Sequence, residues 1–411
     1  MRAMAKPRHL IPAPVSRGRK LARRSFLRGA VGLAVGASLA VPGRGLAAAG
    51  GGGKFDLGKL RSYWNEIPDS KLSAAFPDLS DPALAALYTP VWGYGGPGAG
   101  LQAWSGASLD LIHRKFMFGA RGGHGAYWGN DFYVFDFATM KWLRVKDTRP
   151  GGAVEPVAAH GYCGDQCLDD FNLYVGVGSE PGVTDSVNLY VFDLALNDWL
   201  PTPLLKNQGA PYQAMYLRKQ KKLLLFPGVT AQGGFHIYDP ATKTMLDRPA
   251  ILWGPGPPSY AINAYTGDEK TGVFFNDGFM YLLDMTDSMN PKSKTYVFSQ
   301  AMLTAFGQSG HDATLVDPIP NPADVINFDY GMDYHPPSDT FIAWKGFGDV
   351  IQFDHKTLTF KRIPLPAGNL APPAPTMTNG IFGSWRYVPE FDAFMGFASL
   401  DSNMWIYKAP G

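Results

Sequence analysis

Acidic residues are absent from the first 50 positions of this 411-residue chain, although ten of its 37 lysines and arginines lie there. The rest of the chain carries 27 basic and 35 acidic side chains, a net charge of −8, so the formal charge of +2 describes only the whole sequence. Nonspecific nucleic-acid binding needs a basic footprint, so the acidic remainder argues against a nucleic-acid partner.

Charged residues, cysteines and long apolar runs are scarce as well. Charged residues make up 18% of the chain, against about 25% in an average globular domain, and there are only two cysteines. No apolar run reaches the ~20 residues of a membrane-spanning helix, so we expect no stable membrane anchor. Glycine (48), proline (34) and aromatic residues (13%) are abundant instead, which favours turns and short strands over helices.

The basic N-terminal segment has the layout of an export signal. Residues 23–28 (RRSFLR) resemble the twin-arginine export motif; a weakly apolar run at 29–41 and a small-residue stretch at 45–49 follow. The resemblance implies a signal peptide at 1–49, a linker at 50–54 and a folded domain at 55–411. It also implies the twin-arginine translocase as an export partner and a periplasmic or secreted product.

A repeated unit fills the folded domain. Each copy has a β-rich run that ends in Asp, or in Lys408 in the last copy, and Trp142 and Trp199 follow the first two Asp residues by six positions. The runs lie at 132–136, 189–193, 235–239, 280–284, 350–354 and 404–408. Their spacing resembles that of kelch repeats, which are about 50 residues long.

Two further strands precede each run, so each copy predicts a propeller blade of four short antiparallel strands. The second strands are predicted at 115–119, 172–176, 222–226, 271–275, 340–344 and 393–397. The first strands are predicted around Trp104, Tyr162, Tyr216, Tyr265, Tyr334 and Tyr387. The last copy lacks an outer strand, which residues 61–68 can supply, and this closure removes an exposed sheet edge.

We therefore predict an all-β fold, a kelch-like β-propeller of six four-stranded blades closed by an N-terminal strand. The long spacing between the fourth and fifth Asp leaves an alternative. Residues 299–327 form either an inserted loop, which we favour, or a seventh blade.

Candidate site residues concentrate in loops that share one face of such a propeller. The loop between the second and third strands of the first blade reads RGGHGAYWGN at 121–130. His124 is a candidate general base, and Arg121 a partner for a carboxylate. Tyr127 and Trp128 are candidates for stacking on a sugar ring, with Asn130 as a polar contact. In the alternative interpretation, His124 and Asn130 only hydrogen-bond the turn.

The connection into the second blade adds His160 and Tyr162, which we expect beside the His124 loop on one side of an extended strand. A buried histidine satisfied by backbone is the alternative for His160. Equivalent connections and the inserted segment add ligand-binding candidates: Gln102, Tyr212, Asn263, His311, Trp385 and Arg386. This aromatic, amide-rich mouth of the central channel fits a carbohydrate or another polar ligand.

Residues 102–136 resemble a kelch-like group of exported bacterial proteins with a Gly-Gly-His, Tyr, Gly-Asn signature. A more distant resemblance is to propeller-type polysaccharide lyases such as the ulvan lyases. It implies proton transfer by a His and a Tyr, with an Arg neutralising a uronate carboxylate. His124, Tyr162 or Tyr212, and Arg121 or Arg386 match these roles. The sequence thus leaves three functions open: a glycan binder, a lyase, or a scaffold for a protein partner.

Cys163 and Cys167 are the only cysteines. They can form a disulfide in an oxidising compartment, remain free thiols, or join His160 in a zinc site completed by Asp165 or Asp169. No cofactor is predicted, and zinc or calcium are the metals left open.

Overall fold

The structure is a computed structural model, and its described residues belong to one compact unit, Gly52–Gly411. They are residues 55–93, 95–98, 106–119, 127–149, 156–179, 188–205, 213–226, 235–248, 261–276, 278–298, 304, 316–318, 326–327, 329–375 and 380–410.

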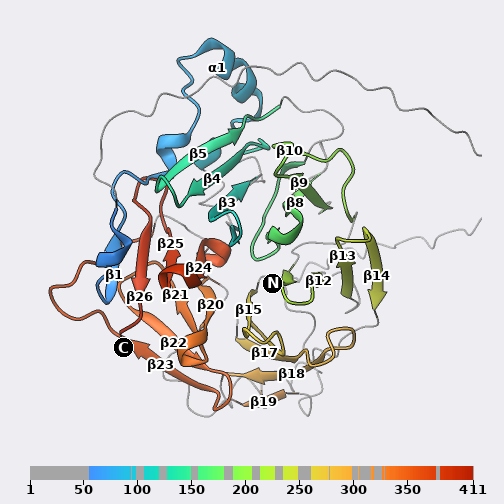
Figure 1. The fold of residues 1–411 in the computed structure, drawn as a ribbon, viewed down its shortest axis with the longest axis vertical. Helices are drawn as coiled ribbons and strands as arrows, with labels where there is room; N and C mark the ends of the chain where they lie inside the picture. Colours follow the sequence, from blue (N-terminus) through green and yellow to red (C-terminus); the bar gives the residue numbers. More distant parts are fainter. Residues whose placement is uncertain are drawn as a thin grey trace, which may run out of the picture. The chain divides into compact units, whose positions relative to one another are not determined.

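Six sheets surround a common axis, with the first strand of each blade innermost (Figure 1); their pairings are antiparallel except between β18 and β19. Blade 1 consists of β2 (Ser108–Asp110), β3 (Lys115–Gly119), β4 (Phe132–Asp136) and β5 (Lys141–Lys146). Blade 2 consists of β6 (Val157–Ala158), β7 (Gln166–Leu168), β8 (Leu173–Ser179), β9 (Asn188–Asp193) and β10 (Asp198–Trp199). Blade 3 consists of β11 (Gln213–Leu217), β12 (Lys222–Phe226), β13 (Phe235–Asp239) and β14 (Thr244–Arg248).

The second half of the ring follows the same order. Blade 4 consists of β15 (Ile262–Tyr265), β16 (Thr271–Asn276), β17 (Phe279–Asp284), β18 (Lys292–Val297) and β19 (Val316–Pro318). Blade 5 consists of β20 (Gly331–His335), β21 (Thr340–Trp344), β22 (Val350–Asp354) and β23 (Thr359–Ile363). Blade 6 consists of β24 (Trp385–Val388), β25 (Ala393–Gly396), β26 (Trp405–Lys408) and β1 (Tyr63–Glu66). The predicted six-bladed, all-β propeller is confirmed.

Helices are few and short. The α-helix whose bounds are described is α1 (Pro82–Tyr88), which begins after the capping side chain of Asp81. The 3-10 turns are η1 (Leu57–Lys59), η2 (Leu72–Ala75), η3 (Thr89–Val91), η4 (Asp169–Phe171), η6 (Pro336–Ser338), η7 (Phe382–Ser384) and η8 (Pro389–Phe391). Within the described ranges, no helix has the length and apolar character needed to cross a membrane.

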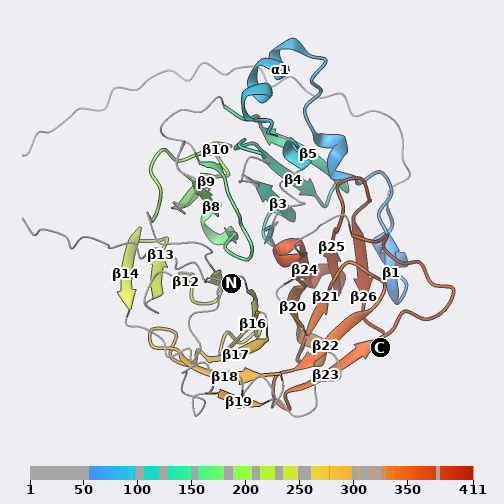
Figure 2. The ribbon, with the colours of Figure 1, turned by 180° about the vertical axis from the view of Figure 1, so that it is seen from behind.

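The ring is closed by its two chain ends, as the sequence predicts. Strand β1 pairs antiparallel with β26, from Tyr63 opposite Lys408 to Glu66 opposite Trp405, and both views show the two strands side by side (Figure 1, Figure 2). The Trp64 ring lies 5.0 Å from that of Trp344 and 5.6 Å from that of Trp385. The closing strand therefore adds aromatic packing to the interface between blades 5 and 6 as well as pairing an open sheet edge.

The repeated Asp at the end of each third strand builds the outer hairpin turn. Its carboxylate accepts the backbone N–H two residues later, at 2.7–3.0 Å, in all five copies that have the Asp. Such side-chain bonds stabilise the turn into the fourth strand. The sixth copy has Lys408 instead because β26 is not followed by a hairpin: its outer partner is β1.

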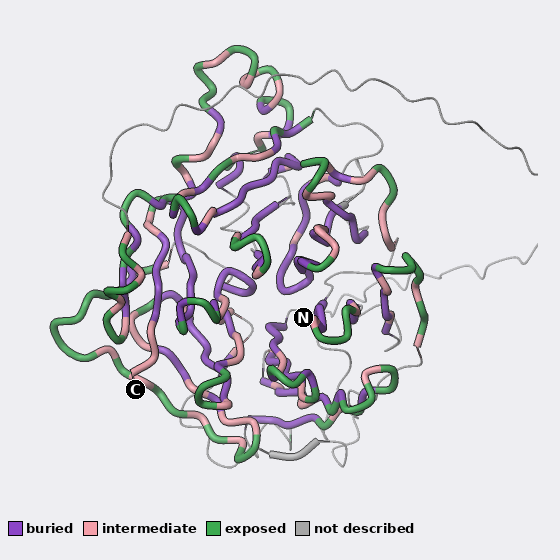
Figure 3. The backbone as a smooth tube through the Cα atoms, viewed as in Figure 1, coloured by how far each residue is buried: buried purple, intermediate pink, exposed green. Residues whose placement is uncertain are grey.

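The apolar core lies between neighbouring blades, where buried segments follow the strands and exposed ones mark the turns (Figure 3). One cluster joins blades 4 and 5 through Phe275, Phe341 and Phe353, for example. Alternate residues of a strand face opposite sides of its sheet, so each blade contributes to two such interfaces.

Three expectations about strands need correction or refinement. The first strand of blade 1 is Ser108–Asp110, later than the predicted position around Trp104, which lies outside the described residues. The first strand of blade 2 is split into β6 and β7, and Tyr162 falls between them with φ at +43°. In the long insertion, β19 pairs in parallel with β18, so this part extends blade 4 and does not start a seventh blade.

Candidate functional site

We call the end of the propeller that carries the turns between first and second strands the hairpin face, and the opposite end the loop face. The predicted site belongs to the loop face. Many connections on that face lie outside the described residues, among them those that hold Gln102, Arg121, His124, Tyr212 and His311. The positions of these five candidates are therefore not described.

Residues 159–165, between β6 and β7, leave the inner strand of blade 2 and reach the axis; we call them the axial plug. Gly164 N–H donates to the Gly161 carbonyl at 2.7 Å, which forms a tight turn around Tyr162. Tyr162 and His160 thus do not lie on an extended strand, contrary to expectation. They nevertheless touch, since the Tyr162 hydroxyl lies 3.5 Å from His160 Nδ1.

The axial plug contacts two other blades, 3 and 6. The Tyr162 ring packs edge-on against Phe382 of blade 6 at 5.2 Å, and the Cys163 carbonyl accepts Ala214 N–H of blade 3. A Cβ on Gly106 would overlap the Asp165 carboxylate and lie 2.6 Å from the Tyr162 carbonyl oxygen, so this close approach requires glycine. Tyr162 is only 1% exposed, which makes it a packing residue of the plug.

A cavity of about 140 Å³ lies on the axis, among the inner strands. Its lining extends from Asn263 and Arg386 within the strands to Leu111, Pro336 and Pro389 at their hairpin ends, so the cavity lies toward the hairpin face. Polar and aromatic residues dominate the rest of the lining. They are Ser108, Gln166, Arg218, Tyr265, Asp333, Tyr334 and Tyr387.

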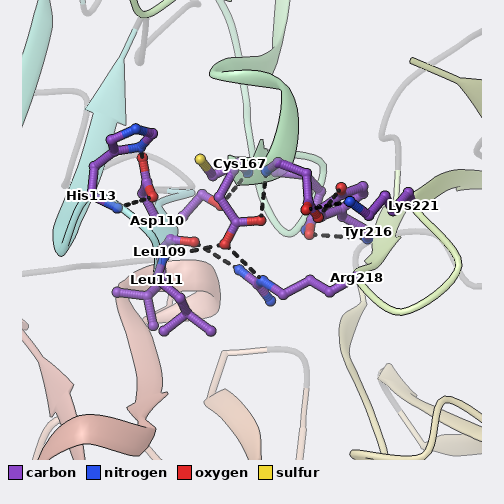
Figure 4. Close-up of polar contacts among 12 residues, drawn as sticks. Leu109, Asp110, Leu111, His113, Cys167, Tyr216, Arg218 and Lys221 are labelled. Carbon is purple, nitrogen blue, oxygen red and sulfur yellow. Dashed lines mark hydrogen bonds and ion pairs between the residues drawn. The ribbon is translucent and has the colours of Figure 1, made fainter. Parts of the chain in front are cut away.

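Arg218 connects blades 1, 2 and 3 at the hairpin end of this cavity (Figure 4). Its Nε donates to Asp169 Oδ2 at 3.0 Å, and its Nη2 donates to the Leu109 carbonyl at 2.8 Å. Asp169 Oδ2 also accepts Leu111 N–H at 3.2 Å, and the Asp169 side chain is 2% exposed. The hydrogen bonds of this guanidinium therefore stabilise the contact among blades 1, 2 and 3.

The Asp333 carboxylate likewise stabilises the contact between two blades. Its two carboxylate oxygens accept the backbone N–H groups of Tyr334 and Tyr387, each at 2.9 Å, and so connect blades 5 and 6.

Arg386 and Gln213, in contrast, have donors that the described residues do not satisfy. Arg386 Nη2 and Gln213 Nε2 are buried without a hydrogen-bond partner in the described part of the chain. Gln213 is fully buried, and its Oε1 accepts Asn263 Nδ2 at 2.9 Å. Because a buried unpaired donor costs about 1–3 kcal/mol, such groups call for an explanation, and a ligand acceptor is one.

Three other described candidates, Asn130, Trp128 and Trp385, form hydrogen bonds within the protein. Asn130 is 4% exposed; its side-chain oxygen accepts Thr148 Oγ1 and Arg149 N–H, and its carbonyl accepts Trp199 Nε1 at 2.8 Å. Trp128 N–H donates to the Val91 carbonyl at 2.9 Å. Trp385 is fully buried, and its indole N–H donates to the Ile342 carbonyl at 3.1 Å.

Tyr127 belongs to a buried carboxyl cluster. Its hydroxyl donates to Asp131 Oδ1 at 2.7 Å, and the Tyr133 hydroxyl donates to Asp131 Oδ2 at 2.5 Å. Burial raises the pKa of Asp131 to about 6, despite the opposing effect of these two hydrogen bonds. Tyr127 is 2% exposed, so it contacts this carboxyl and not the axial cavity.

The two cysteines are free thiols in separate core clusters. Burial raises the pKa of Cys163 to about 11 and that of Cys167 well above its ordinary value, so both stay protonated at neutral pH. Among the residues described, no group of three or more His, Cys, Asp or Glu side chains is arranged to hold a metal ion.

Sequence reasoning identified Asn263 and Arg386 but missed most of the cavity lining. Gln166, Arg218 and Asp333 lie on or just after the inner strands of blades 2, 3 and 5. An alignment of the six first strands by their register with the second strands would have indicated these positions. The loop motif around His124 predicted a site on the loop face instead.

No family model and no curated protein matches this sequence. Three solved structures resemble the fold weakly. TolB from Acinetobacter baumannii has 11% identity and a TM-score of 0.39, with 65% of this chain and 55% of that chain covered. An auxiliary nutrient binding protein from Bacteroides thetaiotaomicron has 11% identity and a TM-score of 0.46, with 75% and 69% covered. A chain of the nidogen/laminin complex has 6% identity and a TM-score of 0.39, with 63% and 79% covered.

This chain thus spans little more than half of TolB. At these identities and TM-scores, the resemblances carry no functional argument. The assignment to six-bladed β-propellers rests on the strand order and register of the chain itself.

Proposed function

We propose that the protein is a binding propeller that takes a small polar ligand, of the carbohydrate class, into the axial cavity from the hairpin face. The observation that carries this proposal is the buried donor of Arg386 Nη2, which has no partner among the described residues although Arg386 lines the cavity. This donor suits the hydroxyl, ring or carboxylate oxygens of a sugar. Gln213 lies outside the lining and contacts it through Asn263.

The size and lining of the cavity support a small ligand. Its volume of about 140 Å³ lies below the ~300–1,000 Å³ of pockets for drug-sized molecules, so it suits one sugar unit or the end of a chain. Tyr265, Tyr334 and Tyr387 supply rings around the polar groups. The axial plug contacts Phe382 and Ala214, which lie near the loop-face ends of the inner strands of blades 6 and 3, and this favours entry from the hairpin face.

A glycan array tests the proposal with three proteins: wild type, Arg386→Met and Lys361→Met. Lys361 is exposed on β23 and does not line the cavity, so it serves as the matched loss of one charge. We expect wild type and Lys361→Met to bind the same glycans and Arg386→Met to lose them. An array without signal, or one on which all three proteins bind equally, would contradict the proposal.

We further propose that the chain is a kelch-type propeller exported by the twin-arginine pathway to the periplasm or beyond. The RRSFLR segment and the acidic remainder support this proposal. Replacing both Arg23 and Arg24 by Lys should leave the protein in the cytoplasmic fraction of the producing bacterium. Export of that variant at the wild-type rate would disprove the proposed route.

The lyase alternative needs His124, Tyr162 or Tyr212, and Arg121 or Arg386. Of these, His124, Arg121 and Tyr212 lie outside the described residues. Mixing the protein with uronate polymers and following the absorbance of an unsaturated product tests it. Product formed by wild type but not by His124→Ala would favour the lyase over the binder.

A further inference from the structure

A second, larger cleft separates blades 4 and 5 at the hairpin face. It has a volume of about 1180 Å³, and it begins where the apolar interface between these blades ends. Blade 4 contributes Leu282 and the turn around Asp268; blade 5 contributes Tyr334, Pro336 and His355. This volume accommodates an organic molecule well beyond the size of an inorganic ion.

Four lysines line this cleft in a protein whose folded part is acidic. Lys270, Lys292 and Lys294 come from blade 4 and Lys356 from blade 5, and all four are exposed. Lys292 and Lys294 are two positions apart on β18, so they project from the same face of the sheet. The lining has these four lysines against three aspartates, so the cleft is slightly positive within an acidic domain, which favours anions there.

The acidic residues of the cleft are held in local contacts. Asp268 accepts Thr266 Oγ1 at 2.6 Å and Lys270 N–H at 3.1 Å, and Asp284 accepts Thr286 N–H at 2.9 Å. Asp339 pairs with Lys356.

Two of the lysines form no direct ion pair. Lys270 and Lys292 have no carboxylate within ion-pair distance among the described residues, although Asp284 lies opposite Lys292 in the strand register. Their ammonium groups are thus the cations most available to a ligand.

Two polar side chains in the wall have unmet hydrogen-bonding capacity. His355 Nδ1 and Ser293 Oγ are buried without a partner among the residues described. Ser293 on the outer strand lies opposite Leu283, the residue before the Asp that ends the third strand. At the equivalent outer-strand position, blades 1, 2, 5 and 6 have Trp142, Trp199, Phe360 and Trp64. Blade 4 therefore has a small hydroxyl side chain at the level where those blades have a large ring.

We propose that this cleft binds an organic anion with a phosphate-like oxyanion. The charged group contacts the ammonium groups of Lys270 and Lys292, because these suit phosphate oxygens as point-charge donors. The uncharged part of the ligand lies against Leu282 and Tyr334. This site is independent of the axial cavity, and nothing in the sequence motifs indicated it.

Calorimetric titration at low ionic strength tests the site with three probes: glucose 6-phosphate, inorganic phosphate and glucose. The proteins are wild type, the double variant Lys270→Met with Lys292→Met, the control Lys361→Met, and Arg386→Met. We expect glucose 6-phosphate to bind more tightly than inorganic phosphate, since only the sugar phosphate also contacts the apolar wall. The double variant should lose about tenfold or more in affinity, because two charged hydrogen bonds are lost.

The outcomes separate this inference from the proposed function. Wild-type affinity in Lys361→Met and Arg386→Met, with loss only in the double variant, supports the cleft. Loss in Arg386→Met alone would assign the ligand to the axial cavity and overturn the inference. Absence of binding to wild type, or equal affinity in all four proteins, would overturn it as well.

Discussion

Two arginines point toward the same axial cavity, yet their surroundings differ. Arg218 donates hydrogen bonds to Asp169 and to the Leu109 carbonyl, and these bonds connect blade 3 to blades 2 and 1. Arg386 has a buried Nη2 without a partner in the described residues, although it too lines the cavity. The Arg218 guanidinium therefore has a structural role, whereas Arg386 Nη2 is a donor that a ligand can use.

Two buried carboxyl groups, Asp169 and Asp131, also differ in the partners that stabilise them. Asp169 pairs directly with a guanidinium, whereas the side-chain partners that bond Asp131 are the hydroxyls of Tyr127 and Tyr133, with Arg144 acting only through its charge. Phenol hydroxyls supply hydrogen bonds but no positive charge, so they offset less of the cost of burying an ionised carboxylate.

Removing Arg218 should have the largest effect on stability. Arg218→Met leaves Asp169 buried without its cation, and we expect a loss of about 3–4 kcal/mol in the free energy of unfolding. The value lies toward the low end for buried pairs because the Arg218 side chain is 34% exposed. Thermal unfolding of Arg218→Met and of the double variant with Asp169→Asn measures it. The double variant should recover part of the loss; if it is the less stable of the two, the ion pair is not the cause.

The pH dependence of stability tests the Asp131 cluster. Its folded pKa of about 6 lies above the ordinary 3.8, so well below pH 3.8 the group is protonated in both states. Between pH 3.8 and 6 mainly the unfolded state ionises, so stability falls across this window by up to about 3 kcal/mol and levels off above pH 6, where both states ionise. The melting temperature of wild type should therefore drop more between pH 4 and pH 7.5 than that of Asp131→Asn. Parallel curves for the two proteins would disprove the raised pKa.

Removing Arg386 should change stability least. Arg386→Met loses a donor that no described residue accepts, so the free energy of unfolding should shift by less than about 1 kcal/mol. Chemical denaturation of Arg386→Met beside Arg218→Met measures the difference directly. A loss as large as that of Arg218→Met would show that both arginines are structural.

The fold followed from the sequence because its signals are local and repeated. The Asp that ends each third strand is required by an Asx-type turn, so it marks the hairpin in every blade that has one. The last copy has Lys408 in place of the Asp and lacks its own outer strand; the strand-like residues 61–68 predicted the ring closure that the pairing of β1 with β26 confirms. The split first strand of blade 2 could not be predicted, since it depends on Gly106 making room for the axial plug.

The site was predicted less well because its determinants are tertiary. Residue type marked Arg386 and Asn263 as candidates, but it also marked Trp385, which packs in the core, and Asn130, which bonds the turn. Whether an arginine is satisfied depends on carboxylates about 50 residues away, as with Arg218 and Asp169. No local pattern encodes that distinction.

Calorimetric titration of an array-selected glycan into wild type, Arg386→Met and Lys361→Met most directly tests the central claim. The axial cavity predicts binding to wild type and Lys361→Met with the same affinity, and a loss of about tenfold or more in Arg386→Met. Equal affinity for all three proteins would contradict it, because Arg386 would then take no part in holding the ligand.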